Sequence, residues 1–212
     1  MARPFGAAAS AEAHERLREE REAGEEETGK EVRSWKGPPG AHEAALAAGS
    51  AVHRALEEWD LDAQPAPELA RQLARLPALV AGVAAPEQRE AAADRARALL
   101  TRAFSAGLVA RLHASRDSVV ARELPVLLPP PADGAGAVGY VSGTIDLLYR
   151  GADGGLVVAD FKTDQVEGEA LTRRAAAYAT QGAAYTRAVQ EALGLRTPPR
   201  FELWFLAAGE II

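Results

Sequence analysis

Cysteine and asparagine are both absent from this 212-residue chain. Without cysteine there can be no disulfide, no thiol nucleophile, no cysteine-based zinc site and no iron–sulfur cluster. No run of about 18 apolar residues is present, so we expect no transmembrane helix and no membrane partner. The first residues also lack the basic segment followed by an apolar run that is typical of a secretory signal. These absences predict a cytoplasmic protein.

Lysine is nearly as rare. The chain has 21 arginines but only Lys30, Lys36 and Lys162, so a lysine inside the folded part invites a chemical explanation. The formal net charge of −6 argues against a protein that coats nucleic acid nonspecifically, although it allows a local basic groove.

The chain changes character near residue 40. Nine acidic residues lie between Glu12 and Glu31, and the segment closes with Gly37-Pro38-Pro39-Gly40, which breaks secondary structure. We interpret residues 1–40 as a charged lead-in or linker, either helical or disordered, and residues 41–212 as the folded domain.

Periodicity in residues 41–212 predicts an α/β fold with a central mixed β-sheet flanked by helices and a helical N-terminal part. Leu46, Val52, Leu56 and Trp59 recur at helical spacing in the first segment. The expected helices are 41–59, 67–76, 87–113 and 169–193. The expected strands, rich in valine, leucine and tyrosine, are 119–128, 138–149, 156–163 and 200–206.

Charged residues gather on two of these strands. Asp146 interrupts an apolar strand, and in the next strand Asp160, Lys162 and Asp164 share one face while Phe161 points the other way. If the strands are neighbours, carboxylates and an ammonium group converge at one edge of the sheet. Carboxylates are hard oxygen ligands that suit Mg²⁺ or Mn²⁺.

An ordinary Asp–Lys salt bridge on a solvated strand is the alternative explanation. However, the preceding residues Leu156-Val157-Val158-Ala159 have the composition of a buried strand. Charges placed directly after such a run are costly unless they have partners. We therefore favour a catalytic site.

These residues resemble a known family. Ile145-Asp146, followed fourteen residues later by Asp160-Phe161-Lys162-Thr163, is similar to the PD-(D/E)xK nuclease core with its restriction-endonuclease-like fold. More narrowly, the pattern resembles the nuclease domains at the C-termini of RecB and AddA helicase–nucleases. The resemblance implies a magnesium-dependent deoxyribonuclease in which Mn²⁺ can substitute.

Three further marks of that family have counterparts between residues 45 and 207. Gly49-Ser50-Ala51-Val52-His53 matches a G-x-x-x-H helix, Glu123 matches an acidic residue on the first strand, and Tyr178-x-x-Gln181-x-x-x-Tyr185 matches the helix after the lysine strand. One departure is Phe161, where the family usually has tyrosine. Taken alone, His53 suits an ordinary surface or core histidine.

The resemblance implies four metal ligands: His53, Asp146, Asp160 and the backbone carbonyl of Phe161. It assigns Lys162 to the attacking water, and Gln181 and Tyr185 to the DNA backbone. Glu123 would hold a second metal or an outer-shell water. A packing stripe is the alternative for the Tyr–Gln–Tyr helix face, but Gln181 would then need a buried partner.

The resemblance also implies a biological setting. The domain would cut single-stranded DNA, as exonuclease or endonuclease, beside a helicase domain or subunit during double-strand-break repair. Relatives with a four-cysteine iron–sulfur cluster do not fit this chain. A stand-alone RecB-like exonuclease, and a non-cleaving DNA-binding or scaffolding domain of such a complex, remain alternatives.

Overall fold

The computed structural model describes residues 40–128 and 141–212. Contacts divide the chain into two units, one made of residues 1–34 and 125–144 and the other of residues 35–124 and 145–212. The first unit's described residues are parts of two strands, and the helices and the candidate site described below belong to the second unit. The lead-in expected at residues 1–40 lies outside the described residues except for Gly40, so the domain boundary there stays a prediction.

Among the described residues, the sheet has five strands in the order β1-β2-β3-β4-β5. Strands β2 and β3 are antiparallel, β3 and β4 are parallel, and β4 and β5 are antiparallel, so the sheet is mixed, as predicted. Four strands match the expected segments, except that residues 138–140 lie outside the description. The short β5 was not expected. The strands are β1 (Val119–Leu128), β2 (Val141–Arg150), β3 (Leu156–Lys162), β4 (Arg200–Phe205) and β5 (Glu210–Ile211).

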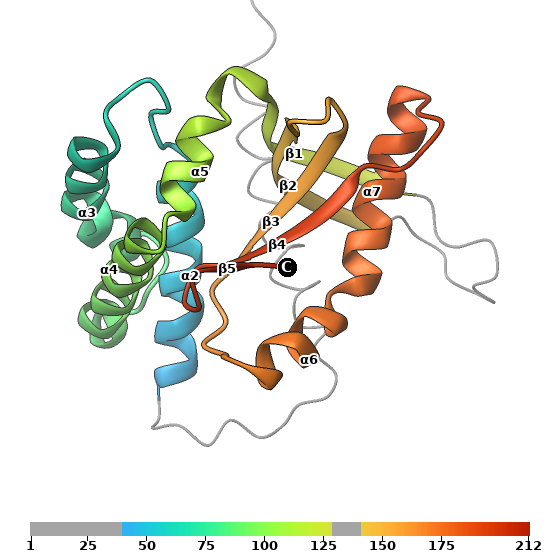
Figure 1. The fold of residues 1–212 in the computed structure, drawn as a ribbon. Helices are drawn as coiled ribbons and strands as arrows, with labels where there is room; N and C mark the ends of the chain where they lie inside the picture. The colour runs from blue at the N-terminus through green and yellow to red at the C-terminus, as the bar shows by residue number, and fades with distance from the viewer. Residues whose placement is uncertain (1–39, 129–140) are drawn as a thin grey trace, which may run out of the picture. The chain divides into compact units, whose positions relative to one another are not determined.

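Helices cover both faces of the sheet. Figure 1 shows α2–α5 on one side and α6 and α7 on the other. The helices are α2 (Ala41–Glu57), α3 (Pro65–Ala81), α4 (Arg89–Ser105), α5 (Leu108–Ala114), α6 (Glu169–Ala177) and α7 (Ala179–Leu193), with short 3₁₀ turns at Pro86–Gln88 and Arg116–Ser118. Among the described residues, no helix is long and apolar enough to cross a membrane.

Three of the expected helices differ from those observed, and two of them lie in the N-terminal half of the domain. The helix expected at 67–76 runs on to Ala81, through Pro77, because Leu76 and Val80 on either side are fully buried and hold the segment on the core. The helix expected at 87–113 is split, since Gly107 has a left-handed φ of 83° that ends one helix and begins the next.

Strand β3 separates two apolar cores. Val157, Ala159 and Phe161 point into the larger core, which α2–α5 cover. The smaller core lies with α6 on the opposite face and includes Leu171, Leu203 and Phe205. All seven residues of β3 are buried, as the apolar run predicted. Leu46 of α2, by contrast, is 52% exposed and does not belong to the core.

Candidate active site

Asp146 connects three elements at the end of the β2–β3 ladder. In the β2–β3 pairing, Leu147 lies opposite Ala159. Asp146, the residue before Leu147, contacts β3 through its side-chain carboxylate. Its Oδ2 accepts a hydrogen bond of 2.6 Å from the backbone amide of Phe161, and its Oδ1 lies 3.1 Å from His53 Nδ1. Asp146 is only 4% exposed, so these contacts fix β3 and α2 to the same buried carboxylate.

Gly49 explains how α2 comes close enough to present His53. A Cβ atom at Gly49 would lie 3.2 Å from Thr163 Oγ1, tighter than most such contacts. The small residue therefore lets α2 lie against the end of β3, one turn before His53. This gives a physical reason for glycine in the G-x-x-x-H pattern.

Glu123 joins His53 and Asp146. One ligand atom from each of the three side chains lies within 4.8 Å of the other two. Glu123 has a φ of 46°, and among the described residues no other non-glycine residue has a positive φ. Such a conformation is costly and often marks a functional position. Three candidate ligands from α2, β1 and β2 thus meet at one point.

Asp160 does not belong to this group of three. Its Oδ2 lies 2.7 Å from Lys162 Nζ, an ion pair without hydrogen-bond geometry, and the same buried oxygen has no hydrogen-bond partner among the described residues. Burial raises the pKa of Asp160 to about 6, even though the Lys162 ammonium lowers it. The Lys162 ammonium therefore offsets only part of the cost of burying the Asp160 carboxylate.

Lys162 is held from three sides. Besides the Asp160 ion pair, its Nζ donates a hydrogen bond of 2.9 Å to Gln181 Oε1 and lies 4.0 Å from the centre of the Tyr178 ring. Gln181 Nε2 in turn donates to the Tyr185 hydroxyl at 3.1 Å. Gln181 therefore has the partners that its place in the helix stripe required.

Tyr178 has a larger part than the sequence indicated. The single helix expected at 169–193 is observed as two helices, and Tyr178 is the one residue between α6 and α7. Its hydroxyl donates to Asp164 Oδ2 at 2.9 Å, and Arg174 Nε donates to Asp164 Oδ1 at 2.7 Å. Burial raises the pKa of Tyr178 further above its ordinary value. β3 ends at Lys162, so Asp164 lies two residues beyond the strand. From there its carboxylate accepts the hydrogen bond of the Tyr178 hydroxyl.

Phe161 points away from Lys162, as expected from strand alternation. Its ring packs in the larger core, 5.6 Å from the Trp204 ring and 6.3 Å from the His53 ring. The predicted role of its carbonyl as a metal ligand stays a prediction.

Comparison with known proteins identifies the family. The sequence profile of the PD-(D/E)XK nuclease superfamily matches residues 11–210. The chain belongs to this superfamily. The resemblance stated from the Asp146, Asp160 and Lys162 motifs is thereby confirmed.

One curated relative is an ATP-dependent helicase/nuclease subunit from Carboxydothermus hydrogenoformans. It is 35% identical over 132 residues, which cover 59% of this chain and 11% of the relative. The chain thus spans about a tenth of that relative's length.

The residues of the site fit a divalent metal, which nucleases of this superfamily use. An imidazole and carboxylates from three elements approach one point, and this donor set suits Mg²⁺ or Mn²⁺.

Proposed function

We propose that this domain is a magnesium-dependent deoxyribonuclease that cuts phosphodiester bonds in single-stranded DNA. The observation that carries the proposal is the convergence of His53, Glu123 and Asp146 within 4.8 Å. The Asp146 carboxylate also binds the amide of Phe161, which lies between Asp160 and Lys162 in the chain. This hydrogen bond therefore connects the candidate ligands to the end of β3 that carries the candidate catalytic lysine.

The proposed metal ligands are His53, Asp146, Asp160 and the Phe161 carbonyl, with Glu123 for a second metal or an outer-shell water. When bound, the cation would polarise the phosphodiester and lower the pKa of a water molecule. Lys162 would orient the attacking water and offset negative charge that develops in the transition state.

Gln181 supports this assignment by holding the lysine. Its carbonyl oxygen accepts from Lys162 and its amide donates to Tyr185, so both ends of the side chain are engaged. These contacts favour a role in fixing the position of the ammonium group. The expected contact of Gln181 and Tyr185 with the DNA backbone stays a prediction.

The proposed setting is a bacterial helicase–nuclease that processes double-strand breaks in the cytoplasm. The 35% identity to a helicase/nuclease subunit supports this setting. We therefore propose a helicase domain or subunit, in the same chain or in another, as the partner that delivers single-stranded DNA.

Digestion of end-labelled single-stranded DNA tests the function. Mg²⁺ or Mn²⁺ should support cleavage, whereas Ca²⁺ should bind without supporting it, because Ca²⁺ prefers more ligands and looser geometry. A Lys162→Ala preparation serves as the matched control for contaminating nucleases. Robust cleavage in excess chelator would contradict the proposal, and DNA binding without cleavage in any metal would favour the scaffolding alternative.

DNA binding by the isolated domain should be weak and should fall steeply with salt. Residues 166–200 carry five arginines against three glutamates, but Arg173, Arg174 and Arg187 are already paired with acidic side chains. Few cations therefore remain for phosphates. Fluorescence anisotropy in Ca²⁺ over a salt series measures this, and tight, salt-insensitive binding would contradict it.

A further inference from the structure

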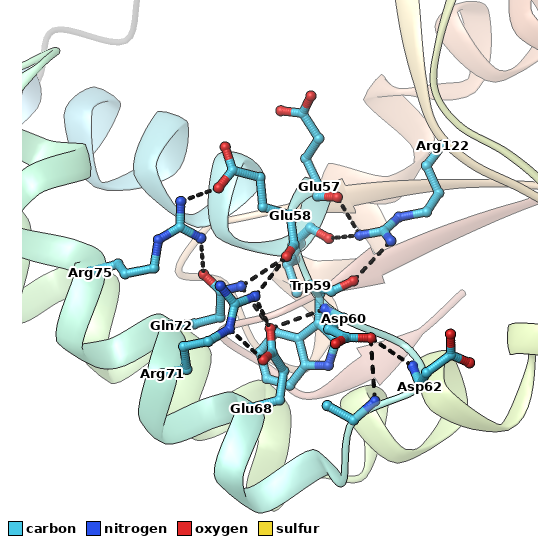
Figure 2. A network of polar contacts seen from close by, with 12 residues as sticks. Glu57, Glu58, Trp59, Asp60, Asp62, Glu68, Arg71, Gln72, Arg75 and Arg122 are labelled. Atoms are coloured by element: carbon cyan, nitrogen blue, oxygen red, sulfur yellow. Dashed lines mark hydrogen bonds and ion pairs between the residues drawn. The ribbon is translucent and has the colours of Figure 1, made fainter.

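Arg122 reaches from β1 to the end of α2. Its Nη1 donates a hydrogen bond of 2.9 Å to the carbonyl of Trp59, and its Nη2 donates to the carbonyls of Leu56 and Glu57. Figure 2 shows the Arg122 guanidinium beside Glu57 and Trp59 at the end of α2. The last carbonyls of a helix lack partners within it and carry partial negative charge, so a cation stabilises them. Arg122 thus caps α2 from a strand more than sixty residues away.

The capped turn adjoins the candidate metal ligand on α2. Leu56 and Glu57 follow His53 by three and four residues, which places them one helical turn further along. Arg122 therefore ties β1 to the turn of α2 that follows His53.

The residue after Arg122 is Glu123, whose carboxylate lies with His53 and Asp146. In a regular strand, consecutive side chains point to opposite faces. The positive φ of Glu123, 46°, interrupts that alternation, so two consecutive side chains of β1 can both approach α2. Arg122 contacts the last turn of α2, and Glu123 lies beside the turn before it.

We infer that Arg122 is a positioning residue for the metal centre: by anchoring β1 to the last turn of α2, it holds the Glu123 carboxylate beside His53 and Asp146. The inference rests on the proposed function, because it assumes that this group binds a divalent cation. It adds a residue outside the ligand set whose loss would weaken metal binding.

A purely structural role for Arg122 is the competing explanation, and the same region offers a matched control. Arg71 also donates to a carbonyl at the end of α2, that of Glu58, at 3.0 Å, and pairs with the buried Glu68. Figure 2 shows both arginines at this helix end. Arg71 lies on α3, and its neighbours in the chain are not in the site. Losing Arg71 should therefore lower stability without displacing Glu123.

The experiment is calorimetric titration of the full chain with Mn²⁺, combined with thermal unfolding. Arg122→Ala should weaken Mn²⁺ binding by about tenfold or more, as is typical when a residue that orients a ligand is removed. Arg71→Ala should leave Mn²⁺ affinity within about twofold although it unfolds at a lower temperature. If Arg122→Ala does not fold, Arg122→Lys gives the same comparison, since one ammonium cannot span three carbonyls as the guanidinium fork does.

A double variant shows whether Arg122 acts through Glu123. In a Glu123→Gln background, Arg122→Ala should cause no further loss of Mn²⁺ affinity, because the carboxylate that it positions is already gone. An equal loss in both backgrounds would overturn the inference.

The remaining outcomes separate the inference from the function beneath it. Mn²⁺ affinity unchanged in both Arg122→Ala and Arg122→Lys would overturn the inference alone. No Mn²⁺ binding by the unaltered protein would overturn the proposed metal centre itself.

Discussion

Lys162→Arg should cleave single-stranded DNA about 10²–10³ times more slowly than the unaltered protein, the usual cost of losing one group that stabilises a transition state. The ammonium lies 2.7 Å from Asp160, 2.9 Å from Gln181 and 4.0 Å from the Tyr178 ring centre, which leaves room for a compact cation. A planar guanidinium cannot satisfy all three at once. Single-turnover rates with saturating Mg²⁺ measure the effect.

Two companion variants sharpen this test. Lys162→Ala should lose activity to a similar extent while Mn²⁺ affinity and fold are kept, because the lysine is not a ligand. Arg187→Lys makes the reverse exchange, guanidinium for ammonium, in an exposed ion pair with Glu191. It should leave the cleavage rate and the Mn²⁺ affinity unchanged. If Lys162→Arg cleaves DNA at close to the parental rate, Lys162 is only a partner for Asp160 and its catalytic role is wrong.

Asp146→Asn should abolish cleavage by removing the metal. The neutral amide keeps an oxygen that can accept from the buried Phe161 amide, but it loses the charge that attracts a cation. Asp146→Ala should lose the metal too, and should also lower the free energy of unfolding by about 1–3 kcal/mol more than asparagine does, because the Phe161 amide is left without a partner. Mn²⁺ titration and denaturant unfolding separate the two effects.

A matched control for this pair is Asp153→Asn. Asp153 lies in the exposed turn between β2 and β3 and pairs with Arg200 at 3.5 Å, so its loss should change neither affinity nor activity. Parental Mn²⁺ affinity in Asp146→Asn would show that Asp146 is not a ligand. Equal stability of the asparagine and alanine variants would show that the Phe161 contact does not stabilise the fold.

Much of the sheet could be predicted because its signals are local. The apolar run Leu156–Ala159 marks a buried strand, and the period of two correctly places Phe161 opposite Asp160 and Lys162. Strand composition and turns also locate β1 and β4 closely. Such features depend on near neighbours in the sequence.

Whether a helix breaks or continues depends here on contacts between distant residues. Pro77 is tolerated inside α3 because buried neighbours keep the helix in place. The break at Tyr178 accompanies a hydroxyl bonded to Asp164 and a ring beside Lys162. Apolar periodicity cannot reveal either effect, since both are set by tertiary packing.

The candidate residues of the site could be proposed from motifs, but their grouping in space could not. The sequence predicts that Asp146 and Asp160 converge if their two strands are neighbours, and it leaves Glu123 as an acidic residue on a third strand. The structure groups Glu123 with His53 and Asp146, whereas Asp160 contacts Lys162. This division depends on the left-handed φ of Glu123 and on the grip of Arg122 on α2, and no sequence pattern indicates either.

Anomalous diffraction from crystals soaked in Mn²⁺ tests the central claim most directly. The account predicts a manganese peak in contact with the His53 ring and the Asp146 carboxylate, with Glu123 and Asp160 lining the same site next to Lys162. A fully occupied manganese peak elsewhere, with these four side chains unchanged and none of them in contact with metal, would contradict it.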